Sequence, residues 1–214
     1  MGLFNDDVKQ QLTDILKEVK NEVHFAFFGK EEGCKSCEET KSFVEEFASL
    51  NDKVSVEVFD VDRDAAKAKE YNVDKVPAIV ILDKDKKDYG VKFYGIPAGY
   101  EINSLIATVM NFSGNREEFS PEIMKRIKAI DKKVHIKVFV TPTCPYCPKP
   151  VITGHRLALE NGNIIAEMVE ATSFPAESQK YAVRGVPKIV INEKHHFVGA
   201  QPIEKFLEVI DSLN

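Results

Sequence analysis

The sequence of this chain repeats itself at an interval of 110 residues. A shift of that size places one Cys-x-x-Cys motif on another, Cys34-Lys35-Ser36-Cys37 on Cys144-Pro145-Tyr146-Cys147. It also places residues 71–81 on residues 181–191, with seven of the eleven residues identical. Because domains most often contain about 100–150 residues, a chain of 214 residues with this repeat is predicted to fold as two copies of one unit.

The boundary between the two copies is predicted from turn and helix-start residues. Loop-forming residues at 111–115 precede Ser120-Pro121-Glu122, which is a typical helix start, so residues 113–120 are the expected link. We therefore predict two domains, residues 1–115 and 116–214, with net charges of −7 and +2. Val23-His24 matches Val134-His135 at a shift of 111, which indicates a one-residue length difference in the loop before the Cys pair.

Each copy shows the same order of hydrophobic patterns. In the first copy, helical spacing and short apolar or alternating runs predict four helices, over residues 8–19, 34–50, 64–71 and 100–109, and four strands, over residues 23–28, 54–61, 78–82 and 91–94. The second copy repeats this order, with a shorter hairpin loop at residues 192–194. The predicted fold class is α/β, with a mixed central sheet flanked by helices in each unit.

A Cys-x-x-Cys motif at the start of a helix favours redox chemistry. The free N–H groups and the positive end of the helix dipole stabilise a thiolate on the first sulfur, and Pro145 suits the first helical position of the second site. A second thiol three positions later lies on the same helix face and can resolve a mixed disulfide.

Two other uses of these cysteines remain open. A structural bridge closing a four-residue loop restricts the unfolded chain by only about 2 kcal/mol, which makes it a weak cross-link. A shared tetrahedral zinc site is the other alternative, but 106 residues separate Cys37 from Cys144, whereas zinc pairs usually lie roughly 15–20 residues apart.

The motifs resemble a known family. Cys144-Pro145-Tyr146-Cys147 is similar to the glutaredoxin active-site sequence, and a Val-Pro about 40 residues after each Cys pair resembles the cis-proline loop of the thioredoxin superfamily. Two such units in one chain resemble the glutaredoxin-like protein disulfide oxidoreductases of thermophilic archaea and bacteria. The resemblance covers roughly residues 5–213 and implies two tandem thioredoxin-fold units.

The resemblance also implies site residues. Cys34 and Cys144 are the expected nucleophiles, and Cys37 and Cys147 the resolving thiols. Pro77 and Pro187 are expected to follow cis peptide bonds, which would turn the backbone of Val76 and Val186 toward the Cys pair, where it could pair with an extended substrate.

The sequence also departs from the family. Thioredoxin-like sites often have a buried Asp on the strand before the Cys pair, where this chain has Phe28 and Val138. Glu57 and Glu167 occupy equivalent positions on strands expected to run beside the helices that begin at the Cys pairs. We therefore consider them as proton shuttles for the resolving thiols, with an ordinary strand carboxylate as the alternative. No role is assigned to His24 and His135.

The two sites are expected to differ in reactivity. Four carboxylates flank Cys34 (Glu31, Glu32, Glu38 and Glu39), opposed only by Lys30 and Lys35, whereas Cys144 has no carboxylate within ten residues. We therefore predict that Cys144 has the lower thiol pKa and that its site dominates reductase activity.

The predicted function is thiol–disulfide exchange with protein substrates, as reductase, oxidase or isomerase, with no metal and no cofactor beyond the redox-active disulfides. One alternative is an electron relay from a thioredoxin-reductase-like flavoprotein to a peroxidase, because the N-terminal part of the alkyl hydroperoxide reductase flavoprotein is similarly built, though it usually keeps one Cys pair. Further alternatives are a peptide-binding chaperone and a zinc-binding structural protein.

Composition sets the expected partners and location. A net charge of −5 and a pI near 5.6 argue against nucleic acid as a partner. The longest uncharged apolar run, residues 76–82, is too short to cross a membrane, and no secretory signal is evident, so we expect a cytoplasmic protein. Disulfide chemistry inside the cell suits a thermophile, which the abundant Lys and Glu favour only weakly.

Overall fold

The chain, as a computed structural model that describes residues 2–213, forms two compact units. The first consists of residues 2–88, 92–96 and 109–116, and the second of residues 89–91, 97–108 and 117–213. Strand β4 (Asp88–Tyr94) and helix α4 (Ile102–Phe112) thus contribute residues to both units. The first unit ends one residue after Asn115, and a sequence boundary after Asn115 remains our proposal for where the two repeats separate.

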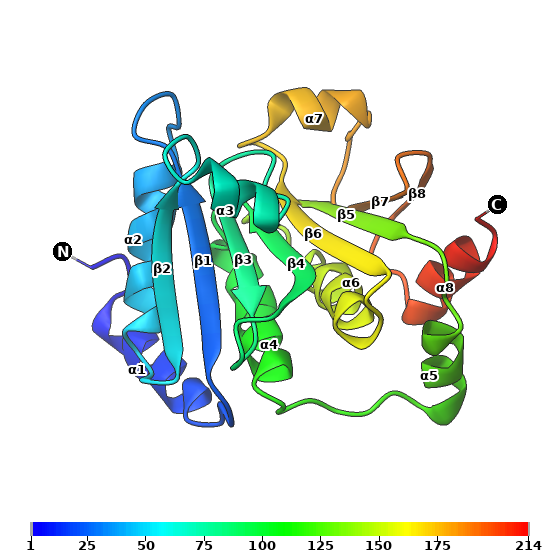
Figure 1. Cartoon of the computed structure of the whole chain (residues 1–214), viewed down its shortest axis with the longest axis horizontal. Helices are drawn as coiled ribbons and strands as arrows, with labels where there is room; N and C mark the ends of the chain where they lie inside the picture. The colour runs from blue at the N-terminus through cyan, green and yellow to red at the C-terminus, as the bar shows by residue number, and fades with distance from the viewer. Residues whose placement is uncertain (1, 214) are drawn as a thin grey trace. The chain divides into compact units, whose positions relative to one another are not determined.

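The first repeat has the predicted αβαβαββα order (Figure 1). Its elements before β4 are α1 (Asp6–Leu16), β1 (Val23–Gly29), α2 (Cys37–Ala48), β2 (Val54–Asp60), α3 (Ala65–Glu70) and β3 (Ala78–Leu82). A short 3-10 helix, η1 (Gly99–Glu101), precedes α4. The strand order is β2-β1-β3-β4, in which β1 pairs parallel with β2 and antiparallel with β3.

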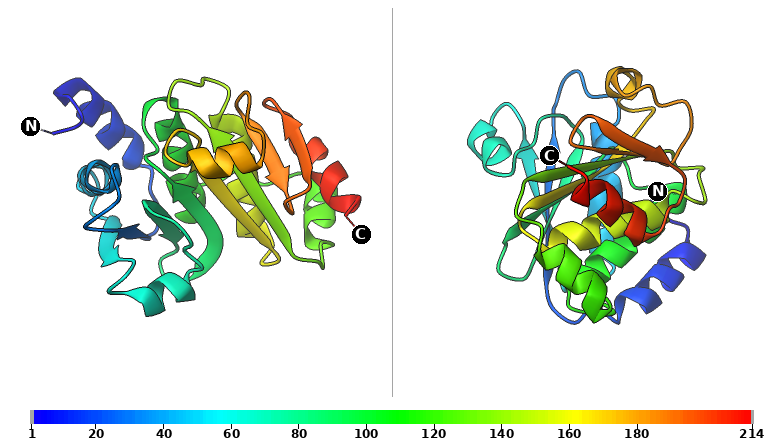
Figure 2. Two further views of the ribbon diagram at one scale, coloured as in Figure 1. Left: turned by 90° about the horizontal axis from the view of Figure 1, so that it is seen from above. Right: turned by 90° about the vertical axis from the view of Figure 1, so that its right-hand side faces the viewer.

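Alternating side chains of β1 pack against different helices. Phe25 stacks on Phe47 of α2, with ring centroids 6.1 Å apart, whereas Phe28 points to the other face and meets Tyr71 at the end of α3. Figure 2 (left) shows α2 and α3 on opposite sides of these strands. The nearly continuous burial of β1 follows from this cover on both faces.

The second repeat has the same order of elements. They are α5 (Pro121–Lys128), β5 (Val134–Val140), α6 (Pro148–Glu160), β6 (Ile164–Glu170), α7 (Pro175–Lys180), β7 (Lys188–Ile191), β8 (His195–Val198) and α8 (Ile203–Asp211). The strand order is β6-β5-β7-β8, again with one parallel and two antiparallel pairs. The predicted fold class, two mixed α/β units of one kind, is confirmed.

Helix α6 covers one face of β5 and β6 (Figure 1). Gly154 lies where an added Cβ would be 3.5 Å from both Ala166 and Ile136, so the helix approaches these strands closely. On the opposite face, Phe139 packs against Tyr181 at the end of α7, and Lys137 Nζ lies 2.6 Å from the carboxylate of Glu177.

Several predicted boundaries shift by a few residues. Helix α1 ends at Leu16, before the buried Val19, and β4 begins at Asp88, three residues earlier than predicted, because Asp88 pairs with Leu82 across an irregular register. The predicted link at residues 113–120 contains no helix or strand, and Ser120 caps α5 by accepting a hydrogen bond from Ile123 N–H. Within residues 2–213, the helices are too short or too polar to span a membrane.

Candidate active site

The first Cys pair lies between β1 and α2 and forms a disulfide. Cys34 and Cys37 are bridged, with their Cα atoms 5.5 Å apart. Helix α2 begins at Cys37, and Ser36 is its N-cap. Cys37 is buried, whereas Cys34 is half-buried. The more exposed cysteine of the pair is therefore the expected nucleophile.

The second pair forms the equivalent disulfide before α6. Cys144 is 8% exposed and Cys147 is fully buried, while the intervening Tyr146 is 70% exposed. The expectation that Pro145 occupies the first helical position is wrong, because the turn continues through Cys147, which caps the helix. Pro148 takes that position instead, where its missing N–H costs the helix no hydrogen bond.

The predicted length difference between the copies lies in the loops before the disulfides. Four residues separate Gly29, the last residue of β1, from Cys34, whereas three separate Val140, the last residue of β5, from Cys144. Strands β1 and β5 therefore match at a shift of 111, and the position equivalent to Val138 is Phe27 rather than Phe28. Both of these residues are apolar and buried, so no carboxylate occupies this place in either unit.

Both prolines of the Val-Pro motifs follow cis peptide bonds, Val76–Pro77 and Val186–Pro187, as the resemblance implied. Strand register brings each motif to the sheet end that carries the disulfide. Phe28 pairs with Ala78, so Pro77 lies across from Gly29, where an added Cβ would be 3.7 Å from the Cβ of Cys37. In the second unit Phe139 pairs with Lys188, which places Pro187 across from the end of β5.

The backbone next to each cis-proline is available for pairing. Pro77 and Pro187 use their carbonyls to accept hydrogen bonds from the N–H groups of Gly95 and Gly199, at 3.0 and 2.9 Å. Among residues 2–213, no hydrogen-bond partner is found for the backbone N–H or C=O of Val76 or Val186. An extended peptide could use these groups as an added strand does.

The structure does not bring Glu57 and Glu167 to the disulfides. Glu57 pairs with Ala26 and Glu167 with Lys137, and parallel neighbours point to the same face of a sheet. That face is the one that α3 or α7 covers, opposite the helix that follows the cysteines. The expected role of Glu57 and Glu167 as proton shuttles is therefore wrong. Both strands do lie beside the helices that follow the cysteines, but the two side chains point to the opposite face of the sheet.

Their actual partners are structural. Glu57 is half-exposed and pairs with Lys86, which holds the pKa of the Glu57 carboxyl below its usual range. Glu167 is buried, and its Oε2 lies 2.9 Å from His135 Nε2. His24 lies 2.7 Å from the hydroxyl of Ser55.

A different carboxyl group, which the sequence analysis missed, lies close to the second disulfide loop. Glu101 is 1% exposed, and the preceding residue, Tyr100, donates its N–H to the carbonyl of Pro142, at 2.8 Å. Pro142 lies two residues before Cys144. Burial, opposed in part by a hydrogen bond from Ser104, raises the pKa of Glu101 to about 7.

Glu101 has one carboxylate oxygen left over. Ser104 donates to Oε2 at 2.5 Å, and Oε1 is buried without a hydrogen-bond partner in the described part of the chain. A sequence signal existed, since Glu101 precedes the buried Leu105 and Val109 at intervals of four and thus belongs to the apolar stripe of the predicted helix.

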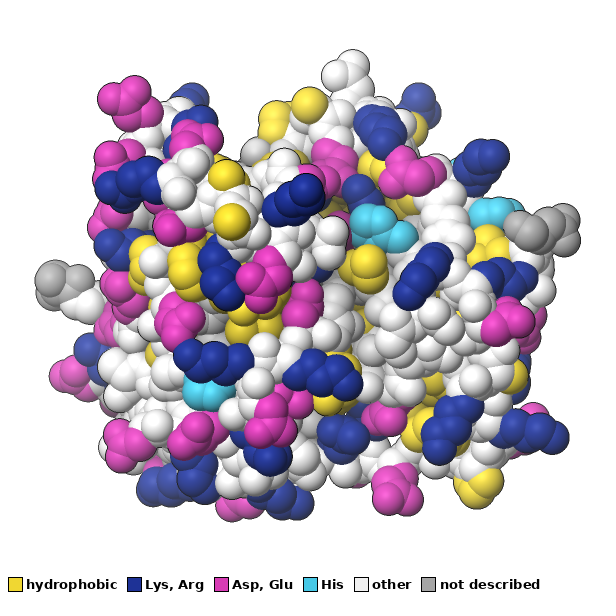
Figure 3. All heavy atoms as spheres, viewed as in Figure 1, with side chains coloured by type: hydrophobic (Ala, Val, Ile, Leu, Met, Phe, Trp, Pro, Cys, Tyr) yellow, Lys and Arg dark blue, Asp and Glu magenta, His cyan; other side chains and the backbone are white. Residues whose placement is uncertain are grey.

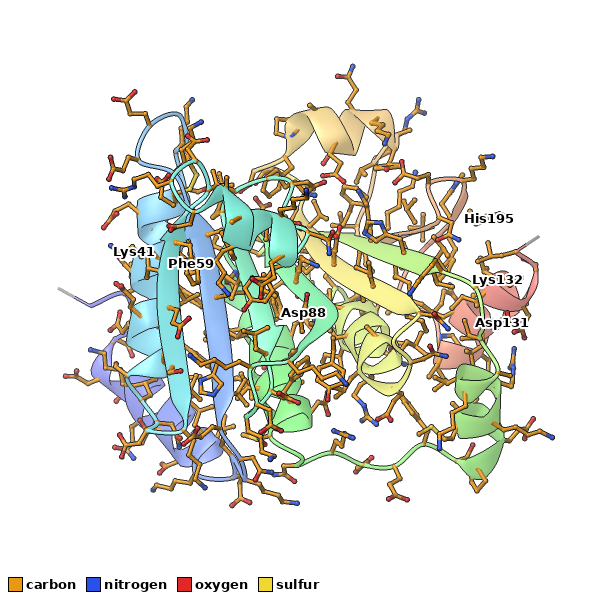
Figure 4. The ribbon with its side chains drawn as sticks, in the orientation of Figure 1. Lys41, Phe59, Asp88, Asp131, Lys132 and His195 are labelled. Carbon is orange, nitrogen blue, oxygen red and sulfur yellow. A yellow bond between two sulfur atoms is a disulfide. The ribbon has the colours of Figure 1, made fainter. Side chains whose placement is uncertain are left out.

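The first disulfide borders a cleft of about 570 Å³ between α2 and β2. Phe27, Val58 and Phe59 supply its apolar surface, and both Cys34 and Cys37 line it. Figure 4 labels Lys41 on α2 and Phe59 on β2, which border the cleft from the helix and from the strand.

Charged residues of both signs surround this cleft. Its lining includes Lys30, Lys41 and Arg63 against Glu31, Glu38, Asp60 and Asp64. Figure 3 shows the same mixture of acidic and basic side chains over the visible face. The fold adds Lys41 and Arg63 to the first site but also Asp60 and Asp64, so the excess of acidic residues seen in the neighbouring sequence remains.

All four cysteines are bridged within their own motifs. In residues 2–213, no group of three or more His, Cys, Asp or Glu side chains is placed to hold a metal ion. The arrangement in each unit is thus a disulfide at a helix start, with a cis-proline motif at the same end of the sheet.

The chain is similar to known proteins. A family model for the thioredoxin domain matches the chain twice, over residues 27–107 and 134–212. The alkylhydroperoxide reductase protein AhpF of Enterococcus faecalis is 31% identical, with a TM-score of 0.91 over 97% of this chain and 99% of that chain. A protein disulfide oxidoreductase from Aeropyrum pernix is also 31% identical, with a TM-score of 0.90 over 97% and 92%.

Curated relatives are longer. The corresponding alkyl hydroperoxide reductase protein of Staphylococcus aureus is 26% identical over 211 residues, which are 98% of this chain and 38% of that protein. The chain therefore spans little more than a third of the length of the curated relatives that it matches.

Proposed function

Because this chain belongs to the thioredoxin-domain family, we propose that it is a redox enzyme, a thiol–disulfide oxidoreductase acting on protein substrates. The observation that carries the proposal is the same arrangement in both units: a disulfide whose second cysteine is buried at the start of a helix and whose first cysteine is the more exposed of the two, and a cis-proline preceded by a valine with unpaired backbone groups. We propose Cys34 and Cys144 as nucleophiles and Cys37 and Cys147 as resolving thiols.

The reduction of a substrate then proceeds in two exchanges. The Cys144 thiolate attacks one sulfur of the substrate disulfide, and the other substrate sulfur leaves as a thiolate that takes up a proton. The Cys147 thiolate next attacks the Cys144 sulfur and releases the second substrate thiol. Two electrons pass to the substrate, and the protein ends with the Cys144–Cys147 disulfide.

Val76 with Pro77, and Val186 with Pro187, are proposed to hold the substrate. The unpaired backbone groups of Val76 and Val186 favour an extended peptide beside the disulfide, which aligns the substrate sulfur for attack. We propose a cytoplasmic reaction that uses no cofactor besides the redox-active disulfides.

The resolving thiol of the second site must lose a proton before it attacks. Glu101 is a buried carboxyl group beside the disulfide loop, and its pKa of about 7 suits a proton acceptor at neutral pH. We propose Glu101, and no longer Glu57 or Glu167, as the group that takes this proton.

The test is insulin reduction, run beside refolding of scrambled ribonuclease, with wild type, Cys34→Ser and Cys144→Ser. We expect both activities in wild type and a large loss in Cys144→Ser. A chaperone whose thiols are incidental would keep its refolding activity after replacement of all four cysteines. Absence of both activities in reduced wild type would refute the proposed function.

A second candidate function is supported by the match to AhpF of Enterococcus faecalis, whose TM-score of 0.91 equals that of the disulfide oxidoreductase within 0.01. The chain would then relay electrons from a thioredoxin-reductase-like flavoprotein to a peroxidase. Oxidation of a reduced nicotinamide cofactor in a mixture of such a flavoprotein and a peroxidase, dependent on both this chain and peroxide, would favour the relay over general disulfide exchange.

A further inference from the structure

The second redox site carries an arginine without an acidic partner beside its cis-proline motif. Arg184 is exposed and lies two residues before Val186, and among residues 2–213 no ion pair or hydrogen bond of its side chain is found. Arginine binds carboxylates well, because its planar guanidinium can donate two parallel hydrogen bonds. The unpaired guanidinium lies next to the motif that is proposed to hold the substrate, so it is suited to bind an anionic group of that substrate.

Arg184 borders a cleft of about 600 Å³ in the second unit. Residues 171–172, helix α7 and residues 182–184 surround it, and Arg184 is its only charged lining residue among those described. Ala171 N–H donates to the carbonyl of Val140 at 2.9 Å, so this side of the cleft begins at the end of the strand that leads into the disulfide loop. Residues 182–184 lead directly into Val186–Pro187.

The surroundings of the second disulfide contain few carboxylates to compete for Arg184. The sequence has no Asp or Glu between Asp131 and Glu160, the stretch that includes both cysteines. Glu170, at the end of β6, accepts hydrogen bonds from Thr172 and Ser173, and Glu177 of α7 is paired with Lys137. Glu101 is buried.

The first unit has an acidic residue at the position equivalent to Arg184. Asp74 is the repeat equivalent of Arg184, and it is paired with its neighbour Lys75 at 2.9 Å. Asp62 likewise stands where the second unit has Thr172. The first cis-proline loop thus presents a paired Asp74 and Lys75, whereas the second presents an arginine followed by Gly185.

We infer that the second site selects substrates with a carboxylate next to the reacting disulfide and that Arg184 binds this carboxylate. The inference rests on the proposed function and names its substrate class: acidic segments of proteins. An exposed ion pair contributes about 0.2–1 kcal/mol, and values in the middle of that range, counted once for attraction of an acidic substrate and once for repulsion of a basic one, predict a rate ratio of about threefold to tenfold.

The experiment uses the full chain with Cys34→Ser and Cys37→Ser, reduced with dithiothreitol that is then removed. Three synthetic peptides each carry one cysteine as a mixed disulfide with thiopyridine, flanked by Glu, Gln or Lys. Attack by the Cys144 thiolate on the peptide sulfur releases thiopyridone, whose absorbance reports the rate, and Cys147 then releases the peptide thiol. The rate with the Gln peptide is the reference for the other two.

We expect the Glu peptide to react about threefold to tenfold faster than the Lys peptide at low ionic strength. The ratio should fall to about one in Arg184→Gln and below one in Arg184→Asp. In about 1 M salt it should approach one in the parent, since the Debye length is then about 3 Å. Lys149→Gln, which removes an exposed cation of α6 outside the cleft, is the matched control and should keep the parent ratio.

An unchanged ratio in Arg184→Gln, or a ratio lost in Lys149→Gln instead, would overturn the role of Arg184 while leaving the proposed function intact. Failure of the parent to release thiopyridone from any peptide would overturn the proposed function and this inference together. The two failures are distinguished by the Gln peptide, which requires thiol exchange but no charge recognition.

Discussion

The carboxyl group of Glu101 links the stability of this protein to the chemistry proposed for its second site. Its pKa rises from 4.5 to about 7 because the side chain is buried with a single donor, Ser104. A group that holds its proton more tightly in the folded chain than in the unfolded chain stabilises the fold at low pH. That contribution is lost as the pH rises from about 4.5 toward 7, because the unfolded chain gives up the proton first.

We predict that Glu101→Gln makes the protein more stable at pH 8 than wild type and removes part of the pH dependence. A shift from 4.5 to about 7 corresponds to about 3 kcal/mol, and a neutral amide does not bear this cost. Urea unfolding of both oxidised proteins between about pH 4 and pH 8 measures the difference. Parallel stability curves for the two proteins across this range would contradict the burial argument.

The same substitution should slow the second site. We predict that Glu101→Gln lowers the rate of the resolving step about 100-fold near pH 7, since general base catalysis typically contributes at least this much. The deficit should shrink as the pH rises, because hydroxide then removes the proton from Cys147. Rapid mixing of the reduced protein with a disulfide peptide follows the mixed disulfide directly. Glu167→Gln is the control, and a slower resolving step in that variant would restore Glu167 as the shuttle.

Among the structural elements, η1 positions the loop of the second disulfide. Gly99 has a φ of +61°, and a Cβ at this residue would lie 2.2 Å from the carbonyl oxygen of Pro142. Gly33, in the loop of the first disulfide, also has a positive φ, +83°, but has no atom within 4 Å of such a Cβ. A comparison of alanine substitutions at the two glycines therefore separates the cost of backbone strain from the cost of a steric clash.

We predict that Gly33→Ala costs about 1 kcal/mol, from backbone strain alone, and that Gly99→Ala costs more than about 2 kcal/mol, since its Cβ must also displace the loop at Pro142. Gly99→Ala should in addition slow peptide reduction at Cys144 and leave the rate at Cys34 unchanged. Denaturant unfolding and single-site kinetics measure both effects. Equal costs for the two variants would show that η1 does not constrain the loop.

The two active-site helices offer competing influences on their thiolates. The first three residues of α2 are Cys37, Glu38 and Glu39, which supply three N–H groups and two carboxylates, whereas Pro148 and Pro150 leave α6 with only the N–H of Lys149. We predict that the nearby carboxylates affect thiolate stability more than the helix N–H groups do, and that Cys144 is therefore alkylated faster than Cys34 at mildly acidic pH. Iodoacetamide reactivity of full-length variants that keep only one of these two cysteines tests this. Faster alkylation of Cys34 would show that the N–H donors of the helix outweigh nearby carboxylates.

The helices and strands were largely predictable because the same hydrophobic pattern occurs twice in the sequence. The αβαβαββα order and the one-residue difference before the second disulfide both follow from hydrophobic periodicity and the repeat. The sheet face to which the Glu57 side chain points was not predicted, since it depends on the register between β2 and β1. Glu101 was missed because it belongs to the first half of the sequence but to the second compact unit.

In the molecule as a whole, each redox site is complete within its own unit. Each has its disulfide, its cis-proline motif and a helix that begins at or next to the second cysteine. General disulfide exchange requires no more than this, so the two sites can work in parallel. An electron relay instead passes electrons along a fixed order of sites, which makes every site in the series necessary.

We predict that the sites work in parallel. Cys34→Ser with Cys37→Ser should keep most of the insulin-reducing activity, Cys144→Ser with Cys147→Ser a smaller part, and the variant lacking all four cysteines none. The two partial activities should sum approximately to that of wild type, because independent sites contribute additively. Loss of all activity in both double variants would instead show that electrons pass through the two disulfides in series, the behaviour of a relay.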